Sequence, residues 1–194
     1  MMEDTIIFID AGFLSKLSKH FGNGEYLKFD IFEFSKILAK KQNLFFKHIY
    51  YYTAPPFQSS HPNENENKRK ENYDRFVNKL SKNKTITIRE GRVQRINDNG
   101  STKYTQKGVD TLLTMDLMSV PIKHNPIKKI ILIACDSDFV PVINNLNSIG
   151  IITILLTYFD RKRNSNFSSS NELMQAVSRC VQITKQNFED SNSN

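Results

Sequence analysis

Two carboxylates stand one residue apart at the end of an apolar run. Residues 129–134 read KIILIA, and Asp136, Ser137 and Asp138 follow after one cysteine. Neighbouring carboxylates repel each other unless a cation or hydrogen-bond donors compensate their charge. Two interpretations are therefore open: an acid here caps a following helix, or the pair holds a cation that takes part in chemistry.

Other acids occupy comparable positions elsewhere in the chain. Asp10 directly follows the apolar run TIIFI, and Asp110 comes just after a turn expected at Gly108. In open α/β sheets, ligands bind at the edge formed by the carboxyl ends of the strands. If the strands are parallel and adjacent, Asp10, Asp110, Asp136 and Asp138 converge at that edge. Capping explains each acid alone, but it does not explain why apolar strands at both ends of the sequence stop at aspartate.

A fifth acid lies within a helical pattern. The helix predicted over residues 109–120 has an apolar face, and Asp116 falls on that face. A buried carboxylate is normally paired, metal-bound or neutralised. Asp116 is therefore either a further metal ligand or a residue bonded to the backbone or to a basic neighbour.

The donor types indicate which cation such a cluster would hold. Carboxylate oxygens suit Mg²⁺ or Mn²⁺, whereas the four histidines and two cysteines are scattered and form no zinc pattern. Mg²⁺ or Mn²⁺ held by carboxylates is suited to phosphoryl chemistry, including hydrolysis of phosphodiesters. The acids therefore indicate a metal-dependent hydrolase of phosphate esters.

The charge balance is consistent with a polyanionic partner. The net charge is +7, and residues 68–95 hold ten Lys or Arg against three acids. This surplus favours a polyanion without specifying one, and a solvated helix face explains residues 68–84 equally well. Arg92, Arg95 and Lys107 are candidates for phosphate contact, and Ser137 joins them as a candidate nucleic-acid contact.

The hydrophobic pattern predicts the elements that position these residues. Continuous apolar runs predict strands at 5–9, 46–52, 85–88, 129–134 and 151–156. Helical spacing predicts helices at 29–41, 63–80, 109–120, 139–146 and 170–177. This alternation predicts an α/β fold in three layers, with a central, mostly parallel sheet flanked by helices.

The chain length fits one domain. We expect a single domain over residues 1–184, a polar loop at 161–169 and a polar C-terminal tail at 185–194. No apolar run approaches the ~20 residues of a membrane span, and the N-terminus lacks the basic region of a signal peptide. We therefore expect a cytoplasmic protein that binds no membrane; whether it forms a homo-oligomer stays open.

Six short motifs, in this order, resemble the NYN domain family, LabA-like branch, within the PIN-like nuclease superfamily: FIDAG, IYYYTAPP, EGR, QKGVDTLLTMDL, CDSDFVP and LLTYF. The resemblance covers residues from about 5 to 184. It implies a PIN-like, Rossmann-like fold and a Mg²⁺- or Mn²⁺-dependent ribonuclease that leaves a 5′-phosphate and a 3′-hydroxyl. It also implies that Asp10, Asp110, Asp136 and Asp138 are the catalytic, metal-binding acids, with Asp116 as the acid of the following helix.

The sequence departs from the family pattern at two places. Many members have glycine where this chain has Cys135, and many have asparagine shortly after the first acid, where this chain has Gly12 and Phe13. Two other functions stay open: a non-catalytic nucleic-acid-binding or regulatory module with the same fold, and a phosphatase-like hydrolase. The last is weaker, because Asp10 is followed by Ala-Gly and not by a second acid two residues on.

Overall fold

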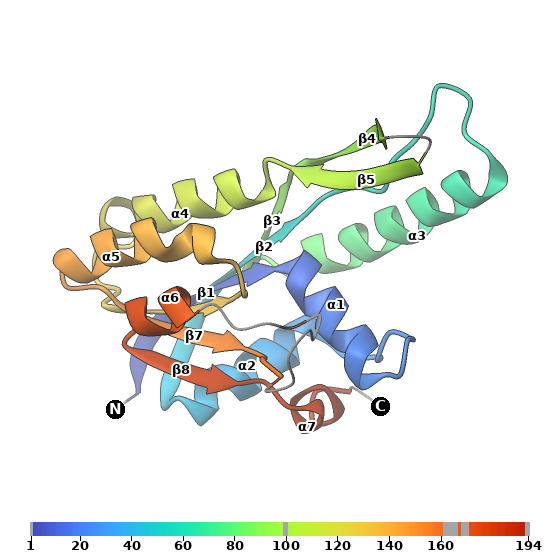
Figure 1. Ribbon diagram of the computed structural model, residues 1–194. Helices are drawn as coiled ribbons and strands as arrows, with labels where there is room; N and C mark the ends of the chain where they lie inside the picture. The colour runs from blue at the N-terminus through green and yellow to red at the C-terminus, as the bar shows by residue number, and fades with distance from the viewer. Residues whose placement is uncertain (1, 99–100, 161–166, 168–170, 193–194) are drawn as a thin grey trace.

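A parallel sheet forms the centre of the protein. The computed structural model describes residues 2–98, 101–160, 167 and 171–192, and its main sheet has six strands in the order β3-β2-β1-β6-β7-β8, all parallel (Figure 1). The strands are β1 (Glu3–Asp10), β2 (Leu44–Thr53), β3 (Ile86–Glu90), β6 (Lys129–Ile133), β7 (Ile152–Thr157) and β8 (Arg179–Gln182). The predicted α/β fold is confirmed.

Helices cover both faces of this sheet. On one face lie α1 (Ala11–Phe21), α2 (Ile31–Lys41) and α7 (Lys185–Glu189); on the other lie α4 (Val109–Lys123), α5 (Val140–Ser148) and α6 (Asn171–Ala176). Strand β1 shows why its sequence is continuously apolar: Ile7 and Ile9 pack toward the α1–α2 face, while Ile6 and Phe8 pack toward the α4–α5 face. The last helix, α3 (Glu64–Ser81), lies beside β3 and buries only Glu66 and Leu80.

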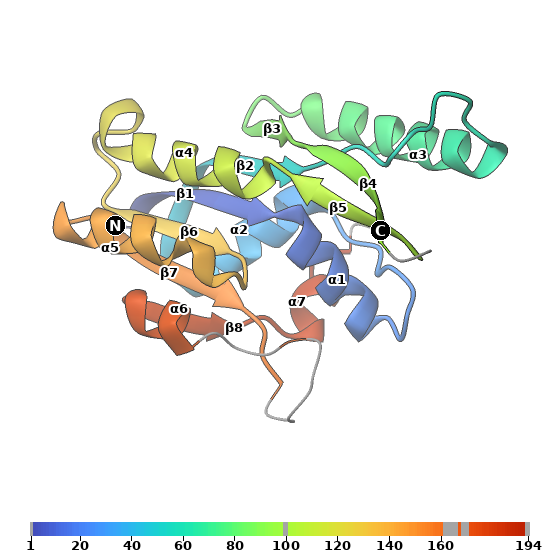
Figure 2. The same ribbon diagram turned by 45° about the horizontal axis from the view of Figure 1, so that its top comes forward.

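Three elements were not predicted. Helix α1 begins directly after Asp10, and the patch at residues 180–183 largely forms β8. An antiparallel hairpin of β4 (Arg92–Asp98) and β5 (Ser101–Lys107) stands apart from the main sheet. All of β5 is exposed, so its sequence needs no apolar face and shows no strand period. In Figures 1 and 2, the hairpin, α1 and α3 lie together at the carboxyl end of the sheet.

The C-terminal segment differs from the expected polar tail. Helix α7 forms there, and its Phe188 is fully buried, with ring centroids 4.9 Å from Phe34 and 4.8 Å from Phe29. Ser191 is also buried, and its carbonyl accepts a hydrogen bond from the Asp30 N–H at 2.9 Å. The packed part of the chain therefore extends past residue 184, because one aromatic residue in a polar run docks without producing any periodic signal.

Two other predictions concern loops and membranes. Of the polar loop expected at 161–169, only Phe167 is among the described residues. Within the described part of the chain, no helix combines the length and the apolar character that crossing a bilayer requires.

Candidate active site

The two strands that carry the predicted acids are neighbours in the sheet. Strands β1 and β6 pair in parallel, with Ile9 opposite Ile133. Asp10 is the last residue of β1, and Asp136 follows shortly after β6. The condition on which the sequence argument depended, parallel and adjacent strands, is therefore met.

Asp10 is held in place by the first turn of α1. Its Oδ1 accepts hydrogen bonds from the N–H groups of Gly12, at 2.8 Å, and Phe13, at 3.3 Å. Burial raises the pKa of Asp10 to about 6, and the nearby charges of Asp110 and Asp136 raise it further against the effect of the two backbone donors. A partly buried carboxylate beside two other acids is favoured in its charged form only by a cation.

Asp110 belongs to the same electrostatic cluster. Gly108 has a φ of +81°, a left-handed conformation that glycine adopts without strain, and it leads directly into α4. This turn places Asp110 in the first turn of the helix. Burial raises the pKa of Asp110, and Asp136 and Asp138 add to the effect. The structure thus places all four predicted acids within electrostatic reach of one another.

The capping role expected for Asp138 belongs instead to Asp136. The Asp136 Oδ1 accepts a hydrogen bond from the Asp138 N–H at 3.0 Å and caps the short 3₁₀ turn η1 (Ser137–Phe139). Both acids are exposed, and Ser137 is half-buried between them. Asp110 is not a cap either, because Gly108 occupies that position.

The four acids fit Mg²⁺ or Mn²⁺ by donor type. Their reported caps use Oδ1 of Asp10 and Asp136, which leaves the second oxygen of each carboxylate for a cation. Among the described residues, no three His, Cys, Asp or Glu side chains stand close enough to form a ready-made ligand set. The arrangement is therefore an open cluster of oxygen donors, in which side chains would turn inward around an ion.

Asp116 lies apart from this cluster and is already paired. It is 5% exposed, and its Oδ2 accepts hydrogen bonds from the Tyr52 hydroxyl at 3.0 Å and from Arg89 Nε at 2.9 Å. Lys123 Nζ lies 3.8 Å from its Oδ1. Of the two interpretations left open by the sequence, pairing with a basic neighbour is the one seen, and we leave Asp116 out of the proposed metal set.

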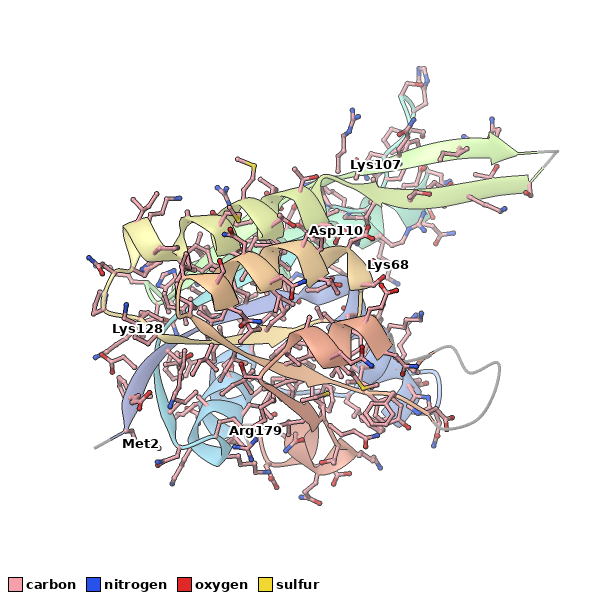
Figure 3. The ribbon with its side chains drawn as sticks, turned by 60° about the vertical axis from the view of Figure 1, so that its left-hand side comes forward. Met2, Lys68, Lys107, Asp110, Lys128 and Arg179 are labelled. Atoms are coloured by element: carbon pink, nitrogen blue, oxygen red, sulfur yellow. The ribbon has the colours of Figure 1, made fainter. Side chains whose placement is uncertain are left out.

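The predicted basic contacts lie on the hairpin. Arg92 and Lys107 are paired across its base, and both line a depression of about 480 Å³ that also includes Gly108 and Thr111. Figure 3 shows Lys107 at the hairpin base and Asp110 at the start of the neighbouring helix. Arg95 is exposed further along β4. Arg92 and Lys107 are thus better placed than Arg95 to contact a phosphate at the acids.

Two residues near the acids were not identified from the sequence. A Cβ atom on Gly12 would lie 3.1 Å from Asp10 Oδ1 and 3.3 Å from Gln106 Oε1, so Gln106 of the hairpin reaches the start of α1. The charge of Lys16 on α1 acts on Cys135, which adjoins Asp136. Lys16 was open to detection, because an α1 helix after Asp10 would have brought it near the edge; Gln106 depends on the unpredicted hairpin.

The two departures from the family pattern have a structural explanation. Phe13 is buried, and its ring packs edge-on against Phe167 at 6.4 Å between centroids, so it points into the core. Cys135 is half-buried against the same core. Burial, helped by Asp10, raises the pKa of the Cys135 thiol to about 11, so this residue is a neutral packing group at neutral pH.

Comparisons with known proteins agree with this fold. The model of the NYN domain family matches residues 4–184. The crystal structure of a protein of unknown function from Vibrio parahaemolyticus superposes with a TM-score of 0.60 at 13% sequence identity, covering 96% of each chain. At that identity the likeness shows a shared fold alone. No curated protein matches the chain.

Proposed function

The chain belongs to the NYN domain family, a family of PIN-like nucleases, and from this premise we propose that it is a Mg²⁺- or Mn²⁺-dependent ribonuclease. The observation that carries the proposal is the cluster of Asp10, Asp110, Asp136 and Asp138 at the carboxyl edge of the sheet, where the first two have raised pKa values. Mutual repulsion of this kind is costly in a folded protein unless a cation relieves it. The LabA-like branch stays a prediction, because the matching model describes NYN domains in general.

In this proposal, the four acids hold the ion and the hairpin holds the substrate. A bound Mg²⁺ or Mn²⁺ supplies polarisation of the phosphodiester and a lowered pKa for the attacking water. Backbone N–H groups fix the carboxylates of Asp10 and Asp136, so their orientation is set before any ion binds. Arg92 and Lys107 lie beside Asp110 and would neutralise the substrate's phosphate charge.

RNA is the finer part of the proposal. The net charge of +7 supports a polyanionic substrate, and the resemblance to the LabA-like branch favours RNA over DNA. A second function, nucleic-acid binding without cleavage, is favoured by one observation: the acids do not form a closed ligand set as they stand.

The test is cleavage of labelled single-stranded RNA by the wild type and by Asp136→Asn. We expect cleavage with Mn²⁺, none with EDTA, and a loss of at least about 100-fold in the variant, since even outer-shell changes at metal sites cost about 10–100-fold. Lys128→Ala is the control, because Lys128 is exposed at the opposite end of the sheet.

Two results would overturn the ribonuclease. One is a purified wild type that cuts neither RNA nor DNA with Mn²⁺; the other is an Asp136→Asn variant that cuts as well as the wild type. RNA binding by such an inactive wild type would support the binding module instead.

A further inference from the structure

A large groove opens beside the acid edge. It has a volume of about 1150 Å³ and is walled by α1, the segment 26–31, α3 and the base of the hairpin. Gly12 and Gln106 line it, and the Gly12 N–H donates to Asp10. One end of the groove therefore reaches the first acid of the candidate active site, and Figure 2 shows α1, α3 and the hairpin gathered on that side.

The charged side chains around this groove are mostly cationic. Among the described residues that line it, five are Lys or Arg and one is an acid. That acid, Asp30, is occupied: its Oδ1 caps α2 by accepting from the N–H groups of Phe32, at 2.9 Å, and Glu33, at 3.1 Å. The cations come from both walls, with Lys19 on α1 and Arg69 and Lys79 on α3. Such a groove attracts a polyanion that runs along it.

Aromatic rings are exposed in the same groove. Tyr26 is 64% exposed, with Lys19 Nζ 4.5 Å from its ring centroid, and Phe76 is 39% exposed on the opposite wall. Phe76 contacts Tyr51, with 5.9 Å between ring centroids. Exposed aromatic rings between cations are the arrangement on which nucleic-acid bases stack.

Packing needs do not explain the α3 wall. Helix α3 buries only two of its 18 residues, so its core contacts do not require Phe76. The helix is nevertheless anchored, because the Tyr73 hydroxyl donates a hydrogen bond to Glu90 at the end of β3. The wall is thus held against the sheet while its aromatic and basic side chains face the groove.

We propose that this groove binds a single-stranded nucleic acid, with bases against Tyr26 and Phe76 and phosphates at Lys19, Arg69 and Lys79. The rings select single strands, because bases in a duplex stack on each other and present only their edges. The inference rests on the proposed function for the polymer, and it adds where the strand lies beyond the scissile phosphate.

The experiment measures binding of a fluorescein-labelled 12-nucleotide RNA, and of the same RNA as a duplex, to the full chain with Asp136→Asn, by anisotropy with Mg²⁺. Added Tyr26→Ala or Phe76→Ala should weaken single-strand binding by about 5- to 150-fold, the effect of losing one stacked base, and should leave duplex binding unchanged. Added Lys19→Ala with Lys79→Ala should lower the slope of log K against log salt by about 1.4, that is 0.7 for each phosphate.

The control is Lys128→Ala in the same background, with unfolding midpoints confirming that each variant is folded. Groove variants that bind single strands as tightly as this control would overturn the groove. The nuclease proposal fails separately: a wild type that cuts no RNA, together with groove variants that lose binding, overturns the nuclease and supports the groove. Cleavage by the wild type with unchanged binding in every groove variant does the reverse.

Discussion

Replacing Asp10 with asparagine should make the metal-free protein more stable at neutral pH while removing a proposed metal ligand. Asparagine caps a helix as well as aspartate does, so the bonds from Gly12 and Phe13 to Oδ1 can persist. What the substitution removes is a negative charge that is partly buried and repelled by Asp110 and Asp136.

The magnitude follows from the pKa of Asp10. Burial first, and then the neighbouring acids, raise this pKa from 3.8 to about 6, and one pH unit corresponds to 1.36 kcal/mol. The folded protein therefore binds this proton more tightly than the unfolded chain, so wild-type stability falls as the pH rises from about 4 to about 6. At pH 7 the variant should be more stable by up to about 3 kcal/mol, or about 6–12 °C in the unfolding midpoint for a chain of this size.

The assay is thermal unfolding followed by circular dichroism, in EDTA, from pH 3.5 to 7.5. The midpoints of wild type and Asp10→Asn should agree near pH 3.5 and separate between about pH 4 and 6, and Mn²⁺ should reduce the gap by stabilising only the wild type. Asp4→Asn is the control, since this exposed acid lies at the other end of β1 and pairs with Lys47 at the surface. A variant no more stable than the wild type at pH 7, or a gap that does not vary with pH, would refute the reasoning.

Three further predictions concern the residues around the site and the end of the chain. Asp116→Asn should lower the free energy of unfolding by about 2–3 kcal/mol in urea, because it removes the charge that pairs with Arg89, yet keep metal-dependent cleavage per folded molecule; a stable but inactive variant would instead make Asp116 a ligand. Cys135 should react with iodoacetamide at pH 8 far more slowly in the folded protein than in urea, measured by mass spectrometry, because burial raises its thiol pKa to about 11; equal rates would contradict that pKa. Phe188→Ala should cost about 3–5 kcal/mol in urea unfolding, whereas exposed Phe45→Ala should cost little; equal effects would mean that α7 contributes nothing to stability.

The sequence was informative where a signal is local and repeated. Strands β1, β6 and β7 are buried on both faces, so each appears as an unbroken apolar run, and the acids at two of their ends could be placed on one edge. Helix α1 was open to the same method, since residues 11, 13, 14 and 17 are buried at helical spacing after a capping aspartate. It was missed because Asp10 was interpreted as the end of a strand only.

Other features depend on partners that are distant in sequence. Asp116 finds Arg89 27 residues away and Tyr52 64 residues away, and no helical pattern can identify such partners. The hairpin is exposed on β5, so it lacks the period that burial imposes. The groove is assembled from α1, α3 and this hairpin together, so it could not be foreseen before their arrangement was known.

The choice between a capping acid and a metal-binding acid, which the sequence presented as alternatives, does not hold at Asp10 and Asp136. In both residues one carboxylate oxygen accepts backbone N–H groups, while the chain direction brings the residue to the shared edge of the sheet. A carboxylate has two oxygens and about four acceptor positions, so capping orients the group without exhausting it. The cap is therefore the means by which a strand end can hold a charged ligand in a fixed direction. For Asp116 the opposite holds, because Arg89 and Tyr52 already compensate its charge. Whether a partner already neutralises an acid, more than whether the acid caps a helix, decides which of these carboxylates remain free to bind a cation.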